Sequence, residues 1–497
     1  MKRNIMLLFG LLLGLSIANV SLAATSSFVF SGAIEVPNSD CSSVTGNSAQ
    51  WCRNAWPPNT RGAVYQYSFK ETRSDTGAVL LRTAYVYKPD LIKAGASYPL
   101  LTFLHGGTQS GDQMFLTYPF AELADGRSNA LAIKWHQNTA ECQLGPFGSS
   151  YVGLGGTSAL GFLKTDGSGN DCMPPRQTYS RSKAASPFYV VYPNGITDYS
   201  GGGRSWEDGR TPSPGQYDGP NPMQQKRDDV GFVNALIATL KQREGTLVDP
   251  TRVYVGGVSN GGVMTTRLLC NTSNGNYPEL AKVAAFSVSA ASMADNLYSG
   301  SNGRELCPNA GSQLTALAIF VGYASRTPNS AGQPFFANCN PYNPSTPMYP
   351  NLPACPYATI SGDGVMPYGG GALDVGGGTY TVNSPTIGNV IASFDNQKFW
   401  LNYFSNSGAG ANTLSSNALG YFTRVRHYRF AQSPMIYQVY ETQNGLHYNS
   451  SSRYDFDAAG RIYDFLFSFR KSAGTLSYIG GTYDPASGSY ANLQGNW

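Results

Sequence analysis

The sequence is poor in charge and in histidine. Charged residues make up 13% of its 497 residues, about half the usual share for a soluble domain, and the net charge is only +4. With so little charge and no basic stripe, nucleic acid is not an expected partner. The hydrophobic share of 41% excludes wholesale disorder, and the 57 Gly and 30 Pro residues favour a loop-rich globular fold.

Long apolar runs are also missing, apart from a short one at the start. Lys2 and Arg3 precede an apolar run from 5 to about 17, and the small residues Ser21 and Ala23 follow it. This order is typical of a secretory signal peptide, and the run is shorter than the roughly 20 residues of a membrane anchor. We expect a signal peptide over 1–23 and one domain over 24–497, secreted or periplasmic and monomeric.

None of the eight cysteines forms a C-x-x-C pair, so neither a zinc site nor a thioredoxin-like site is expected. Export places the cysteines in an oxidising compartment, where an even number favours disulfides. Many connectivities are possible. The simplest one joins nearest neighbours: Cys41–Cys52, Cys142–Cys172, Cys270–Cys307 and Cys339–Cys355.

Short β-rich runs bounded by Gly or Pro alternate with helical patterns along the chain. This alternation predicts an α/β fold with a mostly parallel central sheet flanked by helices. The strand-like runs are 64–69, 80–87, 98–104, 188–192, 252–257, 283–288, 317–321, 423–430 and 435–440. The helical patterns cover 228–243, the segment from 260 onward, 389–404 and 454–469.

Three kinds of segment depart from this alternation. Residues 24–60 form a Ser-rich lead-in, and the last 25 residues are typical of a terminal hairpin. Two loop-rich insertions, near 142–187 and 325–362, contain two cysteines each. Loops of this length are usually functional or disordered, and we expect disulfides to order these two.

A G-x-S-x-G motif runs from Gly257 to Gly261, with Ser259 at its centre. The motif alone is weak, and an ordinary glycine-rich turn is the alternative. Its position between a strand-like run and a helical run is that of a nucleophile elbow. Such a turn strains the serine backbone, admits only small neighbours and exposes the serine oxygen at the edge of the sheet.

A nucleophilic serine needs a base, and the candidates are His105, His136, His427 and His447. His105 sits in a Gly-Gly turn, where we expect a structural role. His427 lies within an alternating strand-like run. His447 follows a late strand in a loop, which is where this kind of fold places its base, so we expect His447 to be the base.

The acid of a Ser–Asp–His triad should lie between Ser259 and His447. The candidates there are Asp295, Asp363, Asp374 and Asp395. Asp395 falls in a helical pattern and is expected on a solvated face. Asp363 lies in a turn and is the preferred acid, while Asp374, in a glycine-rich segment, stays open as an alternative. The acid would orient the histidine and stabilise its charged form.

A tetrahedral intermediate needs hydrogen-bond donors for its negatively charged oxygen. The backbone N–H of Asn260, directly after the nucleophile, is one expected donor. The second is expected from the loop after an early strand, where Gly107 is the preferred donor and Thr108 the near alternative. The run 166–171 resembles a calcium loop but is more typical of a plain turn, so we expect neither metal nor cofactor.

Taken together, a series of short segments along the chain resembles one known family. They are the segments 104–109, 192–195, 204–206, 228–232, 248–255, 257–262 and 363–368 and the loop around His447. Together they resemble the extracellular polyhydroxybutyrate depolymerase and feruloyl/acetyl-xylan esterase group of secreted α/β-hydrolases. The two long insertions depart from the compact members of that group.

This resemblance implies an α/β-hydrolase fold and a cofactor-free esterase with the triad Ser259, Asp363 and His447. It implies that Trp206 lines the substrate cleft, although Trp206 could equally be a core aromatic. Thr108, beside the expected oxyanion donor Gly107, is also expected to bind the substrate. It also implies a disulfide between Cys270 and Cys307 beneath the nucleophile helix.

The expected function is therefore a secreted carboxylic-ester hydrolase. Its low surface charge suits a neutral extracellular polyester or a bulky aromatic or polysaccharide ester. Two alternatives are a secreted acyltransferase of the same fold and, less favoured, a non-catalytic polymer-binding protein.

Overall fold

The computed structural model of the chain describes a defined set of residues. They are 26–36, 62–74, 77–107, 109–118, 120–125, 187–197, 204–210, 227–294, 297, 307, 314–325, 360–361, 371–372, 389–390, 393–419, 423–443, 458–480, 483–484 and 489–490. The expected signal peptide, three of the four expected disulfides and most of both insertions lie outside these residues.

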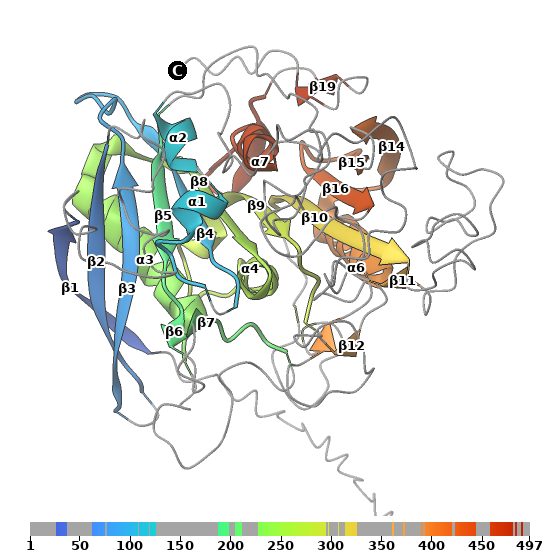
Figure 1. Cartoon of the computed structure of the whole chain (residues 1–497). Coiled ribbons are helices and arrows are strands. Elements are labelled where there is room, and N and C mark those ends of the chain that lie inside the picture. Colours follow the sequence, from blue (N-terminus) through green and yellow to red (C-terminus); the bar gives the residue numbers. More distant parts are fainter. Residues whose placement is uncertain are drawn as a thin grey trace, which may run out of the picture.

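A 12-stranded sheet crosses the molecule in the order β1-β2-β3-β5-β4-β8-β9-β10-β16-β15-β14, with β11 paired to β10 (Figure 1). The strands from β5 to β16 in that order are parallel, and antiparallel strands extend the sheet on both sides. Their bounds are β1 Ser27–Glu35, β2 Ala63–Thr72, β3 Val79–Lys88, β4 Tyr98–Leu104, β5 Tyr189–Pro193, β8 Val248–Val258, β9 Val283–Ser289, β10 Ala316–Ser325, β11 Ile360–Ser361, β14 Asn412–Leu419, β15 Thr423–Phe430 and β16 Ile436–Gln443.

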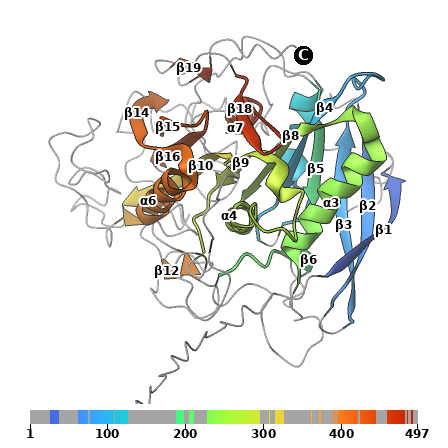
Figure 2. The ribbon, with the colours of Figure 1, turned by 180° about the vertical axis from the view of Figure 1, so that it is seen from behind.

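The parallel strands are mostly apolar because both faces of the sheet are covered. Every residue of β9 is buried, as is every residue of β5. Helices α1 (Met114–Thr117), α2 (Phe120–Ala124) and α7 (Ala458–Leu466) cover one face of the sheet, and α3 (Asp229–Glu244), α4 (Asn260–Cys270) and α6 (Ser393–Phe404) cover the other (Figures 1 and 2). This is the layered α/β arrangement expected from the sequence.

Short elements complete the described structure. Two-stranded pairs join β6 (Ile196–Thr197) to β7 (Arg204–Ser205) and β12 (Gly371–Ala372) to β13 (Asn389–Val390). Near the C-terminus β17 (Phe469–Ser472) pairs with β18 (Thr475–Tyr478), and β19 (Tyr483–Asp484) pairs with β20 (Ser489–Tyr490). Single helical turns occur at Gly245–Leu247, Leu280–Lys282 and Ser405–Ala409.

Each predicted strand-like run is a strand, and each predicted helical pattern contains a helix. Two of the helices are shorter than expected, because β13 occupies the start of the 389–404 pattern and β17 takes the end of the 454–469 pattern. The expected lead-in was wrong in one respect, since its residues Ser27–Glu35 form the edge strand β1. The expected terminal hairpin begins earlier, at Phe469, and is followed by a second short pair.

A buried ion cluster ties the antiparallel edge of the sheet to α3. Arg82 on β3 donates to Glu71 on β2 at 2.7 Å and also to Asp229 at the start of α3. All three side chains are fully buried. Although burial raises the pKa of Asp229, the charges of Arg82 and Arg227 outweigh it, so that this pKa lies below its usual value. The cluster fixes α3 against the strands that lead into the site.

Candidate active site

Ser259 occupies the sharp turn between β8 and α4. Its backbone angles are φ 56° and ψ −124°, a region that residues other than glycine rarely adopt. The Ser259 N–H donates to the carbonyl of Ser289 at the end of β9 at 2.9 Å, and the Ser259 carbonyl accepts from the N–H of Val263 at 2.9 Å. The neighbouring strand and the first turn of α4 thus hold this strained conformation, while the Ser259 side chain stays partly exposed.

Glycine is required on both sides of Ser259 because other backbone lies too close for a side chain. A β-carbon on Gly257 would lie 2.4 Å from the carbonyl oxygen of Gly261. A β-carbon on Gly261 would lie 2.3 Å from the carbonyl oxygen of His105. These contacts give the G-x-S-x-G spacing its physical reason, and they confirm the predicted elbow.

The strand order settles the fold. Along the chain, β2, β3, β4, β5, β8, β9, β10 and β16 lie side by side in sequence order except that β5 lies between β3 and β4. The strained serine follows the fifth strand of this series and opens a helix. The chain has the α/β-hydrolase fold.

The turn after β4 lies directly against the elbow. A β-carbon on Gly106 would lie 3.2 Å from Ser259 Cβ, and one on Gly107 would lie 3.6 Å from Asn260 Cβ. The Gly106 N–H is occupied, because it donates to Gln109 Oε1 at 2.9 Å. Within the described part of the chain, the backbone N–H groups of Gly107 and Asn260 have no hydrogen-bond acceptor. These are the two donors that the sequence predicted for an oxyanion.

His105, at the start of this turn, is held inside the protein as a neutral ring. Its Nε2 accepts from the N–H of Gly195 at 2.9 Å, and its Nδ1 lies 2.6 Å from the carbonyl oxygen of Gly106, so Nδ1 carries the proton. Burial lowers the pKa of His105 to about 4. A buried, neutral ring with both nitrogens engaged cannot serve Ser259 as a base, which agrees with the structural role expected for it.

Trp206 links the start of α4 to the turn after β4. Its backbone N–H donates to Asn260 Oδ1 at 2.7 Å, and its carbonyl accepts from Asn260 Nδ2 at 3.1 Å. Its indole N–H donates to the carbonyl of His105 at 2.9 Å, and the two rings lie 4.9 Å apart. The side chain is fully buried, so of the two roles considered for Trp206 the geometry is that of a packing residue.

The Asn260 amide makes a third contact that secures this segment. Asn260 Nδ2 donates to Asp208 Oδ2 at 2.6 Å, and the same carboxylate binds Arg210 through Nε and Nη2 at 2.7 and 2.6 Å. Asp208 and Arg210 are both buried. Paired charges of this kind hold a rigid geometry, because breaking them would leave an uncompensated buried charge.

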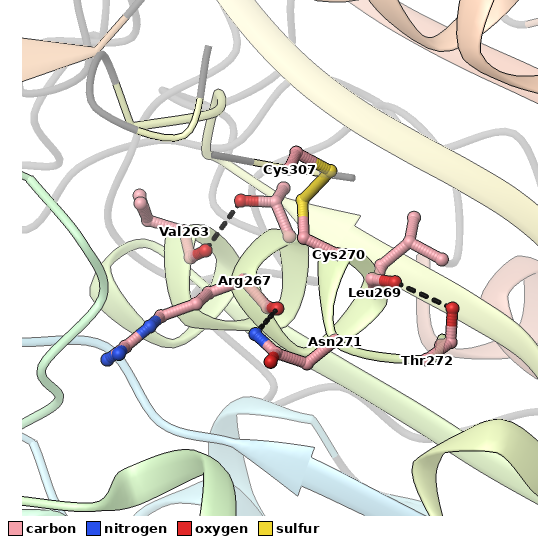
Figure 3. Close-up of a disulfide and its surroundings, with 8 residues drawn as sticks. Val263, Arg267, Leu269, Cys270, Asn271, Thr272 and Cys307 are labelled. Atoms are coloured by element: carbon pink, nitrogen blue, oxygen red, sulfur yellow. Dashed lines mark hydrogen bonds between the residues drawn. A yellow bond between two sulfur atoms is a disulfide. The ribbon is translucent and has the colours of Figure 1, made fainter. Parts of the chain in front are cut away.

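A disulfide lies at the end of α4 that is opposite Ser259. Cys270, the last residue of α4, is bonded to Cys307, as Figure 3 shows. Side-chain hydrogen bonds from Asn271 to the Arg267 carbonyl and from Thr272 to the Leu269 carbonyl cap the same end. The predicted Cys270–Cys307 pair is confirmed, and the other six cysteines lie outside the described residues.

Several predicted site residues cannot be placed. Asp363, Asp374, His447, His136 and Thr108 lie outside the described residues, so the base, the acid and the Thr108 contact stay predictions. His427 is buried on β15, where burial, with the charges of Arg429 and Arg461, lowers its pKa to about 3. The described residues contain no group of His, Cys, Asp or Glu side chains arranged to hold a metal. Nor do they contain a helix long and apolar enough to cross a membrane.

Sequence signals for the supporting contacts were weak. The pairing of Trp206 with Asn260 and His105 joins segments far apart in the chain, and only the resemblance singled out Trp206. The Asp208–Arg210 pair and Gln109 were not predicted at all. The only sequence signal was an acid two residues before a cation, directly after the Trp206 motif.

No protein-family model matches this sequence, and none of the curated proteins matches it. Among solved structures, it is similar to an acetyl xylan esterase from Aspergillus awamori, with 12% identity and a TM-score of 0.34 over 74% of this chain and 89% of that one. It is also similar to a ferulic acid esterase, with 11% identity, a TM-score of 0.29 and 53% and 80% of the chains covered. A third similar structure is an S-formylglutathione hydrolase from Agrobacterium tumefaciens, with 12% identity and a TM-score of 0.28 over 54% of this chain and 77% of that one. At these low scores the fold assignment rests on the strand order and on the turn at Ser259.

Proposed function

We propose that this chain is a secreted serine esterase that hydrolyses a neutral polymeric or aromatic ester outside the cell. One observation carries the proposal: Ser259 is held in a strained turn at the start of α4, beside the Gly106–Gly107 turn. Elbow geometry of this kind presents a serine oxygen to a carbonyl carbon. The two available N–H groups of Gly107 and Asn260 supply what a developing oxyanion needs.

In the proposed reaction, the Ser259 oxygen attacks the ester carbonyl while His447 accepts its proton. The carbonyl oxygen becomes an oxyanion that receives hydrogen bonds from Gly107 and Asn260. His447 then protonates the leaving alcohol. In the second half, His447 takes a proton from water, the water oxygen attacks the acyl carbonyl, and the proton passes to the Ser259 oxygen as its bond to the acyl group breaks. Asp363 would hold the His447 tautomer and stabilise the charged ring.

The proposal is tested by ester turnover of the purified mature protein and of Ser259→Ala. Short p-nitrophenyl esters test the chemistry, and polyhydroxybutyrate film, methyl ferulate and acetylated xylan test the substrate class. Ser273→Ala is the matched control, because Ser273 is an exposed serine just beyond α4. The proposal would be overturned if Ser259→Ala kept its turnover, or if the wild-type protein turned over none of these esters.

The rest of the triad is tested by substitution and by pH. His447→Ala should abolish turnover, and Asp363→Asn should lower kcat far more than Asp374→Asn does. Because a base must be neutral to accept a proton, kcat/KM should fall as pH drops below about 6.5, the ordinary pKa of histidine. Since the pKa of buried His105 is near 4, it cannot cause a fall in that range.

A further inference from the structure

We propose that Trp206 is a positioning residue that sets the separation of the two oxyanion donors, Gly107 and Asn260. This role rests on the proposed esterase function and deepens it. The two donors belong to different elements, the turn after β4 and the start of α4. In an oxyanion hole both N–H groups must reach one oxygen atom, so a small change in their separation weakens both hydrogen bonds.

Trp206 is bound to the Asn260 side of the site through its backbone. Its N–H and its carbonyl are both engaged by the Asn260 side-chain amide, at 2.7 and 3.1 Å. The buried Asp208–Arg210 pair restrains the same amide through the 2.6 Å contact to Asp208. The Asn260 side chain is therefore fixed to Trp206 and Asp208, while its backbone N–H has no acceptor among the described residues.

Trp206 is bound to the Gly107 side of the site through its indole ring. The indole N–H donates to the His105 carbonyl at 2.9 Å, two residues before Gly107. The His105 ring packs against the indole and accepts from Gly195. Gly195 precedes β6 and Trp206 follows β7, so the paired strands β6 and β7 contact His105, the residue before the Gly106–Gly107 turn, at both its ring and its carbonyl.

The burial of Trp206 defines how it acts. The side chain is 0% exposed, so its influence on a bound ester passes through His105 and Asn260. Trp206 contacts Asn260 through its backbone and the His105 carbonyl through its indole N–H, so substitutions can break the two contacts separately. Loss of the ring N–H frees the Gly107 turn, and loss of the Asn260 amide frees the other end.

The decisive experiment compares Trp206→Phe with Trp400→Phe. Trp400 on α6 is equally buried, and its indole N–H has no acceptor within the described part of the chain, so this control removes an indole without removing such a contact. Each variant is assayed on p-nitrophenyl acetate and on its thionoester, in which sulfur replaces the carbonyl oxygen. Sulfur accepts these hydrogen bonds poorly, so the ratio of the two kcat values reports the oxyanion contacts.

For Trp206→Phe, we expect kcat on the oxygen ester to fall by about 10-fold to 100-fold, somewhat less than the loss of a whole donor. KM should change by less than about twofold, and the ester-to-thionoester ratio should fall with kcat. Trp400→Phe should leave the kcat values and the ratio at the wild-type level. Asn260→Ala, which keeps the backbone N–H but releases Trp206, should lower the ratio in the same way.

The outcomes separate this role from simple loss of folded protein and from failure of the proposed function. Equal loss on both esters would leave the ratio unchanged and overturn the positioning role, as would wild-type kinetics in Trp206→Phe. Should Trp206→Phe fail to fold, the ratio in Asn260→Ala decides, and an unchanged ratio there overturns the role. Absence of wild-type turnover on both esters would overturn the esterase proposal and this role with it.

Discussion

The carbonyl oxygen of His105 occupies the space into which a side chain on Gly261 would project. A β-carbon there would lie 2.3 Å from that oxygen and 2.6 Å from the carbonyl oxygen of Leu104. The end of β4 and the start of α4 are therefore in direct backbone contact. This contact places the Gly106–Gly107 turn next to Ser259.

Gly261→Ala should separate the two elements and reduce both stability and activity. Neither neighbour is a flexible side chain, so relief requires movement of backbone, a change typical of strongly destabilising substitutions. We expect a loss of about 2–4 kcal/mol in urea unfolding, and turnover of a p-nitrophenyl ester should slow by about 100-fold or more. Gly275→Ala is the control, because nothing lies within 4 Å of its β-carbon position, and it should stay within about 0.5 kcal/mol of wild type. Equal behaviour of the two variants would contradict the close approach.

Arg82→Met should destabilise the fold by about 3–5 kcal/mol, because it removes the cation that bridges the buried carboxylates of Glu71 and Asp229. Urea unfolding at pH 7 measures this loss. The triple variant Arg82→Met/Glu71→Gln/Asp229→Asn should recover much of it, because it removes the stranded charges. An Arg82→Met protein as stable as wild type would show that the cluster does not hold α3.

Lys471→Met should stabilise the protein, and more so at pH 7 than at pH 11. Lys471 on β17 is buried, and its Nζ has no hydrogen-bond partner among the described residues. Burial lowers the pKa of Lys471 to about 8, so charging the folded state costs about 3 kcal/mol when pH is below that value.

The expected change of stability with pH follows from proton binding at Lys471. Between pH 8 and about 10.5 the unfolded chain binds more protons at Lys471 than the folded one, so wild-type stability rises with pH in that window. The advantage of Lys471→Met over wild type should shrink across the same window. Lys93→Met, at an exposed lysine, should show no such trend, and a pH-independent advantage of Lys471→Met would contradict the buried-amine explanation.

Cys270→Ala/Cys307→Ala should lower the free energy of unfolding. The disulfide joins residues 37 apart, and closure of a loop of that length in the unfolded chain corresponds to about 4 kcal/mol in the chain-entropy model. Thermal unfolding of the double variant against wild type measures the effect. Because the bond lies at the opposite end of α4 from Ser259, kcat at low temperature should change by less than about threefold.

Local chemistry explains what the sequence could predict. The elbow was predictable because Gly257, Ser259 and Gly261 are neighbours in the chain and the strained turn needs all three. The buried strands were predictable because apolar runs such as Tyr189–Pro193 are bounded by turn residues. Edge strand β1 was missed because it is only partly buried and lacks a long apolar run.

Long-range contacts explain what the sequence could not predict. Trp206 binds His105 and Asn260, which are 101 and 54 positions away in the chain, and no local sequence pattern predicts either contact. The buried charges of Arg82 and Asp229, 147 positions apart, look like ordinary surface residues in the sequence. Charged residues are rarely buried without a partner, and the partner becomes visible only when the sheet is assembled.

Because β5 lies between β3 and β4 in the sheet, the strands around the site do not assemble in simple chain order. Gly107 and Asn260 meet only after β4 pairs with β8, with β5 and α3 intervening in sequence. Pairing of distant segments must overcome loop-closure entropy and comes late in folding. Under the proposed mechanism, an incompletely folded molecule would therefore lack the two N–H donors beside Ser259, and esterase activity would arise only with the finished sheet.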